Sequence, residues 1–324
     1  MSSSAHYWLL ECGFLPSERN PGRMTTNALK PVIELVEALS ADLPAHRPAT
    51  PPRDLEELDA LFHAVDDPLA ARLRAGLAEI RPEAGWADDE FAPGGAGGEY
   101  WVVDALDGAV QFLQGLPQWC VTVSLVRDGE PVLAVLHSPS LRETYAAERG
   151  AGAWRDGRPI TPSRKTSLDA AVVATSQPPF VTRQREAAAR AGRALPEMLG
   201  RVVAVRNLGP TSWQLADVAS GRLDLFWQYG SDAANLLGAA LVAREAGALV
   251  TTCAGTPWTS TSDSFLAAPA ALHPAAVEIL TEFPADMRPN VAFGALNAPN
   301  ATLGASNAPN ATLGRSTASS DQAV

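Results

Sequence analysis

Residues 101–112 read WVVDALDGAVQF, and the two aspartates in this stretch decide how the rest of the chain is interpreted. The short apolar run predicts a buried strand that ends in Asp104, Asp107 and Gly108. Carboxylates at the end of a buried strand are costly unless something pairs with them. We expect both on one side of the extended segment, where their oxygens would suit Mg²⁺. Taken alone, the pattern also allows a turn whose aspartates merely cap the next helix.

The flanking sequence predicts a mixed α/β chain. Gly108 opens a short helix, and residues 119–139 alternate and turn at Asp128-Gly129, which is typical of a β-hairpin. The segment 212–227 predicts a helix, a glycine turn and a strand. Helical patterns cover residues 27–43, 55–64, 68–80, 184–199 and 233–246. Pro68 suits a first helical turn, and Gly247 ends the last helix before a strand at 248–252.

The stretch from Trp101 to Ile160 resembles the inositol monophosphatase family pattern W-I-I-D-P-I-D-G-T-x-N-F and the hairpin that follows it. The segment GAGAWRDGRPI at 150–160 and the long segment from RNLGPTSW to REAGALVT at 206–251 match in order as well. The resemblance spans residues ~60 to 280 and identifies a divergent member of this magnesium-dependent, lithium-sensitive phosphatase superfamily. It implies a layered α/β/α/β sandwich of the inositol monophosphatase and fructose-bisphosphatase type, and a homodimer.

Carried over position by position, the resemblance implies a metal site built from distant parts of the chain. It makes Asp104 and Asp107 metal-bridging carboxylates, Leu106 a backbone-carbonyl ligand, and Asp232 the ligand of a second Mg²⁺ ion. Without the resemblance, Asp232 would be interpreted as the N-cap of the helix at 233–246.

A further metal ligand is expected upstream, where the family carries a Gly-Glu-Glu element. The matching stretch here is Trp86-Ala87-Asp88-Asp89-Glu90, and Asp88 is the best match. Its side chain is one methylene shorter than glutamate, so a bridging water, Asp89 or Glu90 are the alternatives. Without a metal, the same stretch would be a solvated acidic loop.

The catalytic positions depart from the family pattern at Ala109. The family carries a threonine there, whose hydroxyl acts with an upstream aspartate, matched here by Asp66 or Asp67, to position and activate the attacking water. Alanine can do neither. General-base assistance is worth about 10² to 10⁴ in rate, so we expect phosphate-ester hydrolysis at the site, where Asp107 is the third expected catalytic residue, to be slower by that order. The backbone N–H groups at Gly108 and Ala109 are expected to bind phosphate.

The substrate end departs as well. Gln228 stands where the family's strand ends in a glutamate that contacts substrate hydroxyls, and Ser212 completes the expected substrate-binding set. Trp213 and Trp227 add bulk nearby. These rings indicate either a pocket for a flatter or more apolar ligand or ordinary core packing.

Composition narrows the class of partner. The chain has 324 residues, 46% of them hydrophobic, and a formal net charge of -11, which would repel a nucleic-acid backbone. The cysteines, which number 3, show no metal-ligand spacing, and neither a basic leader nor a long apolar run is evident. We therefore expect a cytoplasmic protein with reduced thiols, a small phosphorylated metabolite as partner, and neither nucleic acid nor membrane.

The expected organisation is a loose leader (1–25), a half with the metal site (26–165), a second α/β half (166–283) and a disordered tail (284–324). In the tail, ALNAPNATLG at 295–304 recurs as ASNAPNATLG at 305–314.

The leading hypothesis is a Mg²⁺-dependent phosphomonoesterase acting on a small polyol, sugar or related metabolite phosphate, weakened at Ala109. The alternative is a repurposed family member, either a specialised biosynthetic enzyme or a binding protein, that does not hydrolyse phosphate esters. A structural or regulatory pseudo-enzyme that uses the duplicated tail is the third possibility.

Overall fold

A computed structural model describes residues 27–87, 98–178 and 181–281. All of them belong to one of the chain's two units, Met1–Val291. The predicted leader, the acidic stretch Asp88–Glu90 and the repeat-containing tail lie outside the described residues, so the statements about them stay predictions.

The first sheet contains seven strands in the order of the sequence. All neighbouring strands are antiparallel except the first two, which run parallel. The strands are β1 (Gly85–Trp86), β2 (Glu99–Asp107), β3 (Cys120–Arg127), β4 (Glu130–Ser138), β5 (Glu143–Glu148), β6 (Gly152–Arg155) and β7 (Arg158–Pro159). The predicted hairpin is confirmed, because β3 and β4 pair antiparallel across Asp128 and Gly129.

The second sheet has five strands in the order β11-β12-β10-β8-β9. Its central strand β10 runs parallel to β8 and antiparallel to β12. The strands are β8 (Val172–Thr175), β9 (Ala204–Arg206), β10 (Leu225–Tyr229), β11 (Leu249–Thr251) and β12 (Ser264–Ala268). Sheet membership therefore changes between Pro159 and Val172.

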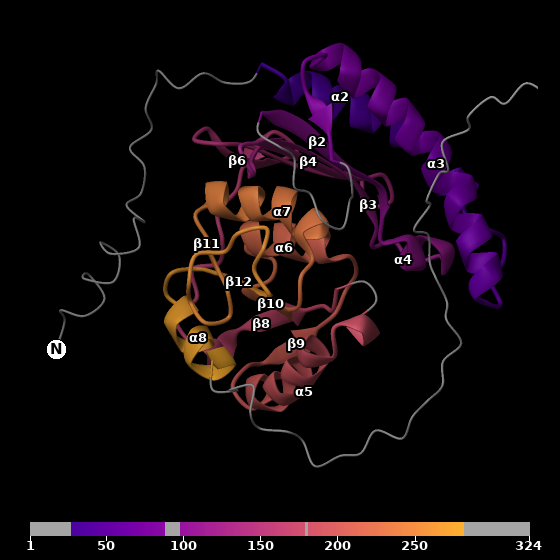
Figure 1. Ribbon diagram of the computed structural model, residues 1–324. Coiled ribbons are helices and arrows are strands. Elements are labelled where there is room, and N and C mark those ends of the chain that lie inside the picture. The colour runs from indigo at the N-terminus through magenta and orange to yellow at the C-terminus, as the bar shows by residue number, and fades with distance from the viewer. Residues whose placement is uncertain (1–26, 88–97, 179–180, 282–324) are drawn as a thin grey trace, which may run out of the picture. The chain divides into compact units, whose positions relative to one another are not determined.

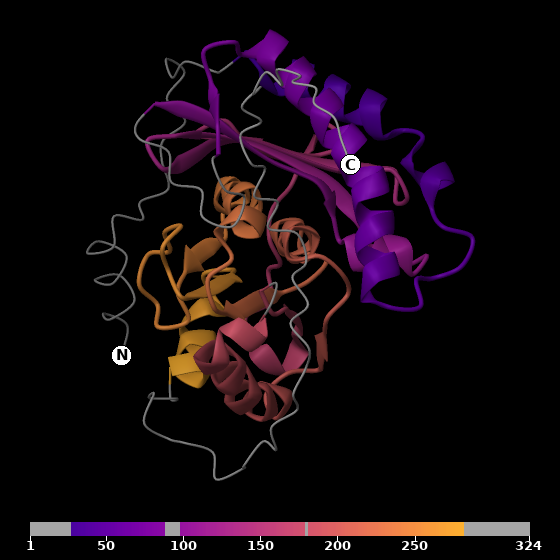
Figure 2. The ribbon, with the colours of Figure 1, turned by 45° about the vertical axis from the view of Figure 1, so that its right-hand side comes forward.

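Helices cover both sheets in layers (Figures 1 and 2). The pair α2 (Leu29–Ser40) and α3 (Leu55–Ile80) packs on the outer face of the first sheet, whereas α6 (Thr211–Ala219) and α7 (Ala233–Ala246) lie between the sheets. The outer face of the second sheet is covered by α5 (Arg185–Leu199) and α8 (His273–Thr281). The short elements are α4 (Ala109–Leu113), η1 (Leu43–His46), η2 (Leu168–Ala170) and η3 (Val181–Arg183).

The central helix α7 is buried nearly all round, which explains its small, apolar composition. At its middle, Gly238 faces β3 so closely that a Cβ would lie 2.3 Å from Ser124 Oγ. A larger residue here would force Ser124 into another rotamer or move the helix away from β3, so this glycine allows the close packing of α7 on the first sheet.

The expected helices at 55–64 and 68–80 form one continuous helix instead, with Pro68 in its interior. The prediction of a break at Pro68 was wrong because tertiary packing outweighs the lost backbone bond. Leu69, Leu73 and Leu77 continue the same buried face that Phe62 and Val65 begin, against the first sheet. The carbonyl of Ala64, which proline leaves without its helical donor, belongs to an exposed residue that water can reach.

None of the helices in the described part of the chain combines the length and continuous apolarity that crossing a bilayer requires.

Candidate active site

A β-bulge at the end of β2 brings Asp104 and Asp107 to the same face of the first sheet. In a regular strand, residues three apart point to opposite faces. Here Asp104 pairs with Thr122 and Asp107 with Cys120, so three steps on β2 match two on β3. The intervening Ala105 and Leu106 both pack in the cluster beneath α2 and α3, which leaves the aspartates on the side of α6 and α7.

Asp107 is 5% exposed, and its hydrogen-bond partners in the described part of the chain are neutral donors. Ser212, in the first turn of α6, donates a hydrogen bond to Asp107 Oδ2, and the Cys120 thiol lies 3.7 Å from the same oxygen. Burial raises the pKa of Asp107 to about 6, although the hydrogen bonds from Ser212 and Cys120 oppose the rise. Asp104 is half-buried, and its Oδ1 accepts the Leu106 backbone N–H at 3.0 Å.

Gly108 turns the chain sharply after Asp107. Its φ is +88°, a left-handed value that glycine adopts without strain, and a Cβ would stand 3.2 Å from Pro210 Cγ. The end of β2 therefore packs closely against Pro210, which precedes α6. The helix α4 that follows is only five residues long, so a helix dipole at Gly108 and Ala109 contributes little to phosphate binding.

Asp232 enters from the second half of the chain, at the start of α7. The expected alternative, an N-cap, does not describe its side chain, which makes no capping bond to the helix backbone. Instead Gln228 Nε2 donates to Oδ2 at 2.7 Å and Asn235 Nδ2 donates to Oδ1 at 2.7 Å. Burial raises the pKa of Asp232 to about 7; the charge of Asp107 adds to the rise, while the two amide donors oppose it.

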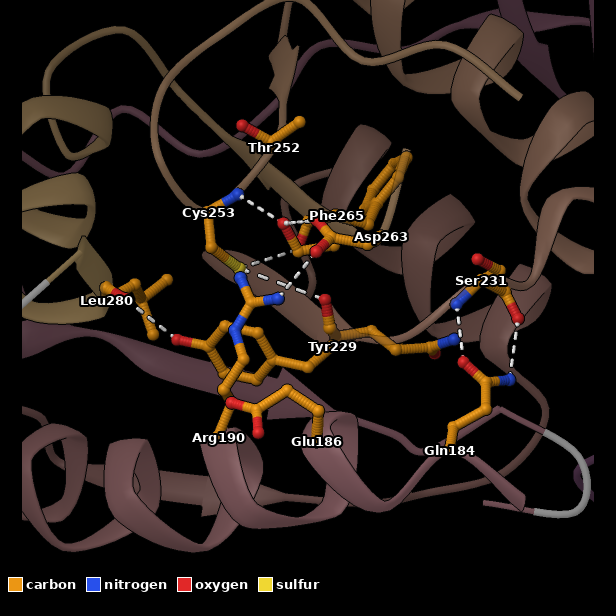
Figure 3. Close-up of polar contacts among 12 residues, drawn as sticks. Gln184, Glu186, Arg190, Tyr229, Ser231, Thr252, Cys253, Asp263, Phe265 and Leu280 are labelled. Atoms are coloured by element: carbon orange, nitrogen blue, oxygen red, sulfur yellow. Dashed lines mark hydrogen bonds and ion pairs between the residues drawn. The ribbon is translucent and has the colours of Figure 1, made fainter. Parts of the chain in front are cut away.

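Side chains from α5 and from the residue before it contact the loop that precedes Asp232 (Figure 3). Gln184 accepts the Ser231 N–H at 2.8 Å and donates to the Ser231 carbonyl at 3.1 Å. Arg190, on α5, lies over the Tyr229 ring, and its Cζ is 4.5 Å from the ring centroid. Its Nη1 also donates to Asp263 Oδ2 at 2.9 Å. The short connection between Tyr229 and Asp232 is therefore held by side chains from another element.

The other predicted residues have distinct places. Asp67 is exposed on α3, 3.2 Å from His63 Nδ1, and Asp66 is half-buried beside it. Ala109 is partly buried and packs at the edge of the cluster under α2 and α3. Asp88 lies outside the described residues.

The two tryptophans are core residues. Trp213 is 3% exposed and packs edge-on against Tyr145 between the sheets. Trp227 is 1% exposed and belongs to the cluster beneath α5 and α8. Of the two interpretations of these rings, the structure therefore supports core packing.

Oxygen donors at this site fit Mg²⁺ in kind. Within the described residues, neither Asp107 nor Asp232 pairs with a lysine or arginine. The negative charges of these two buried carboxylates are therefore opposed by neutral hydrogen-bond donors alone. A divalent cation would compensate that charge. In the same part of the chain no three His, Cys, Asp or Glu side chains form a metal-binding group. Mg²⁺ commonly keeps several waters and uses one or two carboxylates, so an incomplete protein cage suits it.

Three residues at the site, Asn235, Cys120 and Thr211, were not predicted as site residues from the sequence. Asn235 could have been, because a donor three residues after a helix-initiating aspartate commonly bonds back to it. The contacts of Cys120 with Asp107 and of Thr211 with Gln228 depend on how α6 docks against both sheets, and no local pattern signals them.

Fold and site together define a layered α/β protein with acidic side chains from both halves gathered between its two sheets. The family model described as "Inositol monophosphatase family" matches residues 49–284, and the chain belongs to this family. Its fold class is thereby confirmed.

Individual relatives and solved structures also belong to the inositol monophosphatase type. The chain is 35% identical over 188 residues to an inositol-1-monophosphatase of Rhizobium meliloti, covering 56% of this chain and 68% of the relative. It is 34% identical over 162 residues to a Nus factor SuhB of Pseudomonas aeruginosa, covering 50% of this chain and 59% of the relative. The solved inositol monophosphatase of Anabaena superposes with a TM-score of 0.66 at 23% identity, over 80% of this chain and 97% of that one.

Proposed function

We propose that this protein is a Mg²⁺-dependent phosphomonoesterase acting on a small polyol, sugar or related metabolite phosphate. The observation that carries the proposal is that Asp107 and Asp232, buried carboxylates from different halves of the chain with neutral donors as partners, lie near enough for the charge of Asp107 to raise the pKa of Asp232. Phosphatases among its relatives support the same activity.

In this proposal Asp104, Asp107, Asp232 and the Leu106 carbonyl hold the metal ions, together with Asp88. Bound Mg²⁺ would polarise the phosphoryl group and lower the pKa of water at the site. Both of these donors to Asp107 use Oδ2, so Oδ1 would be the oxygen that binds a cation. Ser212 thus fixes the rotamer of Asp107.

The proton acceptor is the weak part of this site. Ala109 offers a methyl group where a hydroxyl would position the attacking water, so Asp66 or Asp67 would have to act through a further water. We expect turnover to be slower by about 10² to 10⁴ than in a site with the hydroxyl.

The test is phosphate release from a panel of polyol, sugar and simple aryl phosphate monoesters, with Mg²⁺ or with EDTA, alongside calorimetric titration of Mg²⁺. Metal-dependent release from any member supports the proposal. Absence of both Mg²⁺ binding and release would refute it.

A second candidate is favoured by Ala109 and by relatives named as Nus factors rather than phosphatases. In it, the chain is a repurposed member, a specialised biosynthetic enzyme or a binding protein, that binds Mg²⁺ without hydrolysing esters. Binding of Mg²⁺ without any release would favour this candidate.

The first proposal also includes the location, the oligomeric state and the ligand class of the protein. We propose a cytoplasmic homodimer that recognises a small phosphorylated metabolite rather than nucleic acid, in keeping with its net charge of -11. The division into halves at 26–165 and 166–283 belongs to the same proposal. Sedimentation of the purified chain tests the dimer directly.

A further inference from the structure

Gln228 is completely buried at the end of β10, and both ends of its amide are engaged. Its Oε1 accepts a hydrogen bond from Thr211 Oγ1 at 3.1 Å, and its Nε2 donates to Asp232 Oδ2 at 2.7 Å. An amide has one accepting and one donating end, so a hydroxyl donor on one side and a carboxylate on the other fix its orientation.

The same turn of α6 holds the other carboxylate. Thr211 and Ser212 are consecutive and buried, and Ser212 donates to Asp107. The start of α6 therefore reaches Asp107 directly and Asp232 through Gln228. Because Asp107 belongs to the first sheet and Asp232 follows the second, this helix start sets the placement of the two carboxylates relative to each other.

We infer that Gln228 is a positioning residue, the middle of a relay Thr211–Gln228–Asp232 that orients Asp232 toward Mg²⁺, and not a contact for substrate hydroxyls. The inference rests on the proposed metal role of Asp232. Gln228 is completely buried, so a substrate hydroxyl could reach the remaining amide N–H or the second lone pair of Oε1 only by parting the side chains that cover it. Recognition of the leaving group then belongs to other side chains.

The relay makes a prediction at a distance. Thr211→Val and Gln228→Met are near-isosteric changes, and Thr211 does not touch Asp232. Calorimetric titration of the full chain with Mg²⁺ should show each variant binding about 10- to 100-fold more weakly, the usual effect of removing a residue that orients a metal ligand. The double variant should bind no more weakly than the worse single variant, because a relay is broken only once.

Gln214→Met is the matched control. Gln214 is also buried, but its amide bonds the backbone of Leu208 and Gly209 instead of a carboxylate. Its loss should leave the affinity for Mg²⁺ unchanged. If a polyol phosphate is hydrolysed, Gln228→Met should keep its KM at saturating Mg²⁺, whereas loss of a substrate contact would raise KM at unchanged metal affinity.

The outcomes separate the two proposals. Unchanged Mg²⁺ affinity in both single variants, additive losses in the double variant, or a raised KM alone would overturn the relay and leave the phosphatase proposal standing. A wild-type chain that binds no Mg²⁺ would overturn both. Weakened, non-additive binding together with an unaffected Gln214→Met variant is the result that we expect.

Discussion

Buried carboxylates occur in two kinds of surroundings in this protein. Asp224, near the junction of the two halves, accepts hydrogen bonds from Lys165 Nζ at 2.7 Å and from the Val172 N–H at 2.6 Å. Glu99, on β2, binds both Arg81 and Arg127. Asp107 and Asp232 are buried like Asp224 and more deeply than Glu99, and their partners among the described residues are hydroxyl, thiol and amide donors.

The difference appears in their protonation. Burial alone would raise the pKa of Glu99, but its hydrogen bonds from Arg127 and Arg81 bring the pKa below its ordinary value. At Asp107 and Asp232 burial prevails and the pKa rises. Asp224 and Glu99 thus have cationic partners within the protein, whereas the carboxylates at the candidate site have neutral donors and are the ones that we propose to bind Mg²⁺.

Neutralising one member of each kind should separate the two kinds of carboxylate most clearly. Asp107→Asn should reduce Mg²⁺-dependent phosphate release by more than about 100-fold, because a ligand matters more than a residue that merely orients one. The metal-free variant should melt no lower than wild type, because a buried charge without a counter-charge is removed. Phosphate release and thermal denaturation in EDTA are the measurements.

Asp224→Asn is the matched control for that variant. It leaves Lys165 without its carboxylate, so we expect a loss of about 1 to 3 kcal/mol in stability and unchanged Mg²⁺ affinity. Were Asp107→Asn to destabilise the metal-free chain as much as Asp224→Asn, the two kinds of carboxylate would be the same and the comparison would fail.

The next prediction concerns what the candidate site lacks. Ala109→Thr restores the hydroxyl after Gly108 and should raise Mg²⁺-dependent hydrolysis by about 10²-fold or more. Initial rates on the best substrate of the panel measure it, with Ala109→Val as a control of equal size that has no hydroxyl. Unchanged, negligible turnover in the threonine variant with intact Mg²⁺ binding would favour the repurposed candidate.

Sequence patterns predicted the local features of this protein well. Asp104 and Asp107 followed from an apolar strand that ends in carboxylates, and the hairpin at Asp128-Gly129 follows from turn chemistry. The expectation that both aspartates share a face could not have come from strand periodicity, which places residues three apart on opposite faces. A bulge, which is set by pairing with β3, makes the expectation correct.

Features that depend on distant packing were less predictable. The break expected at Pro68 was wrong because the apolar face of α3 continues across it. The sequence shows that Gln228 can donate and accept hydrogen bonds. Only the packing of α6 shows that its amide already bonds Thr211 and Asp232. Whether a polar residue faces substrate or another side chain is decided by contacts between elements, which no local pattern encodes.

A smaller effect should appear in the pH dependence of stability. A carboxyl with a raised pKa in the folded state binds its proton more tightly there than in the unfolded chain. Asp232, with a pKa of about 7 against an ordinary value of 3.8, therefore destabilises metal-free protein above pH 7 and does so less as the pH falls toward 4. Thermal denaturation of wild type and Asp232→Asn in EDTA should show a gap between them that narrows by several degrees from pH 8 to pH 5.5.

The variant serves as its own control in that measurement. Buried His273 has a pKa lowered to about 4 by burial, and this destabilises both proteins equally as the pH falls. Taking the difference between wild type and variant cancels the contribution of His273. A gap that stays constant across this range would show that Asp232 has a cationic partner, as Asp224 does.

The smallest expected effect lies at the loop before Asp232. Gln184→Ala removes two partly exposed hydrogen bonds to Ser231, each worth about 0.5 to 1.5 kcal/mol, and should weaken Mg²⁺ binding only a few-fold by loosening that loop. Arg190→Met, on the helix α5 that follows Gln184, removes the contacts with Tyr229 and Asp263 and should lower the melting temperature without changing Mg²⁺ affinity. If both variants lowered Mg²⁺ affinity equally, the site would depend on general packing of α5, and the special role of the carboxylate-bearing loop would be lost.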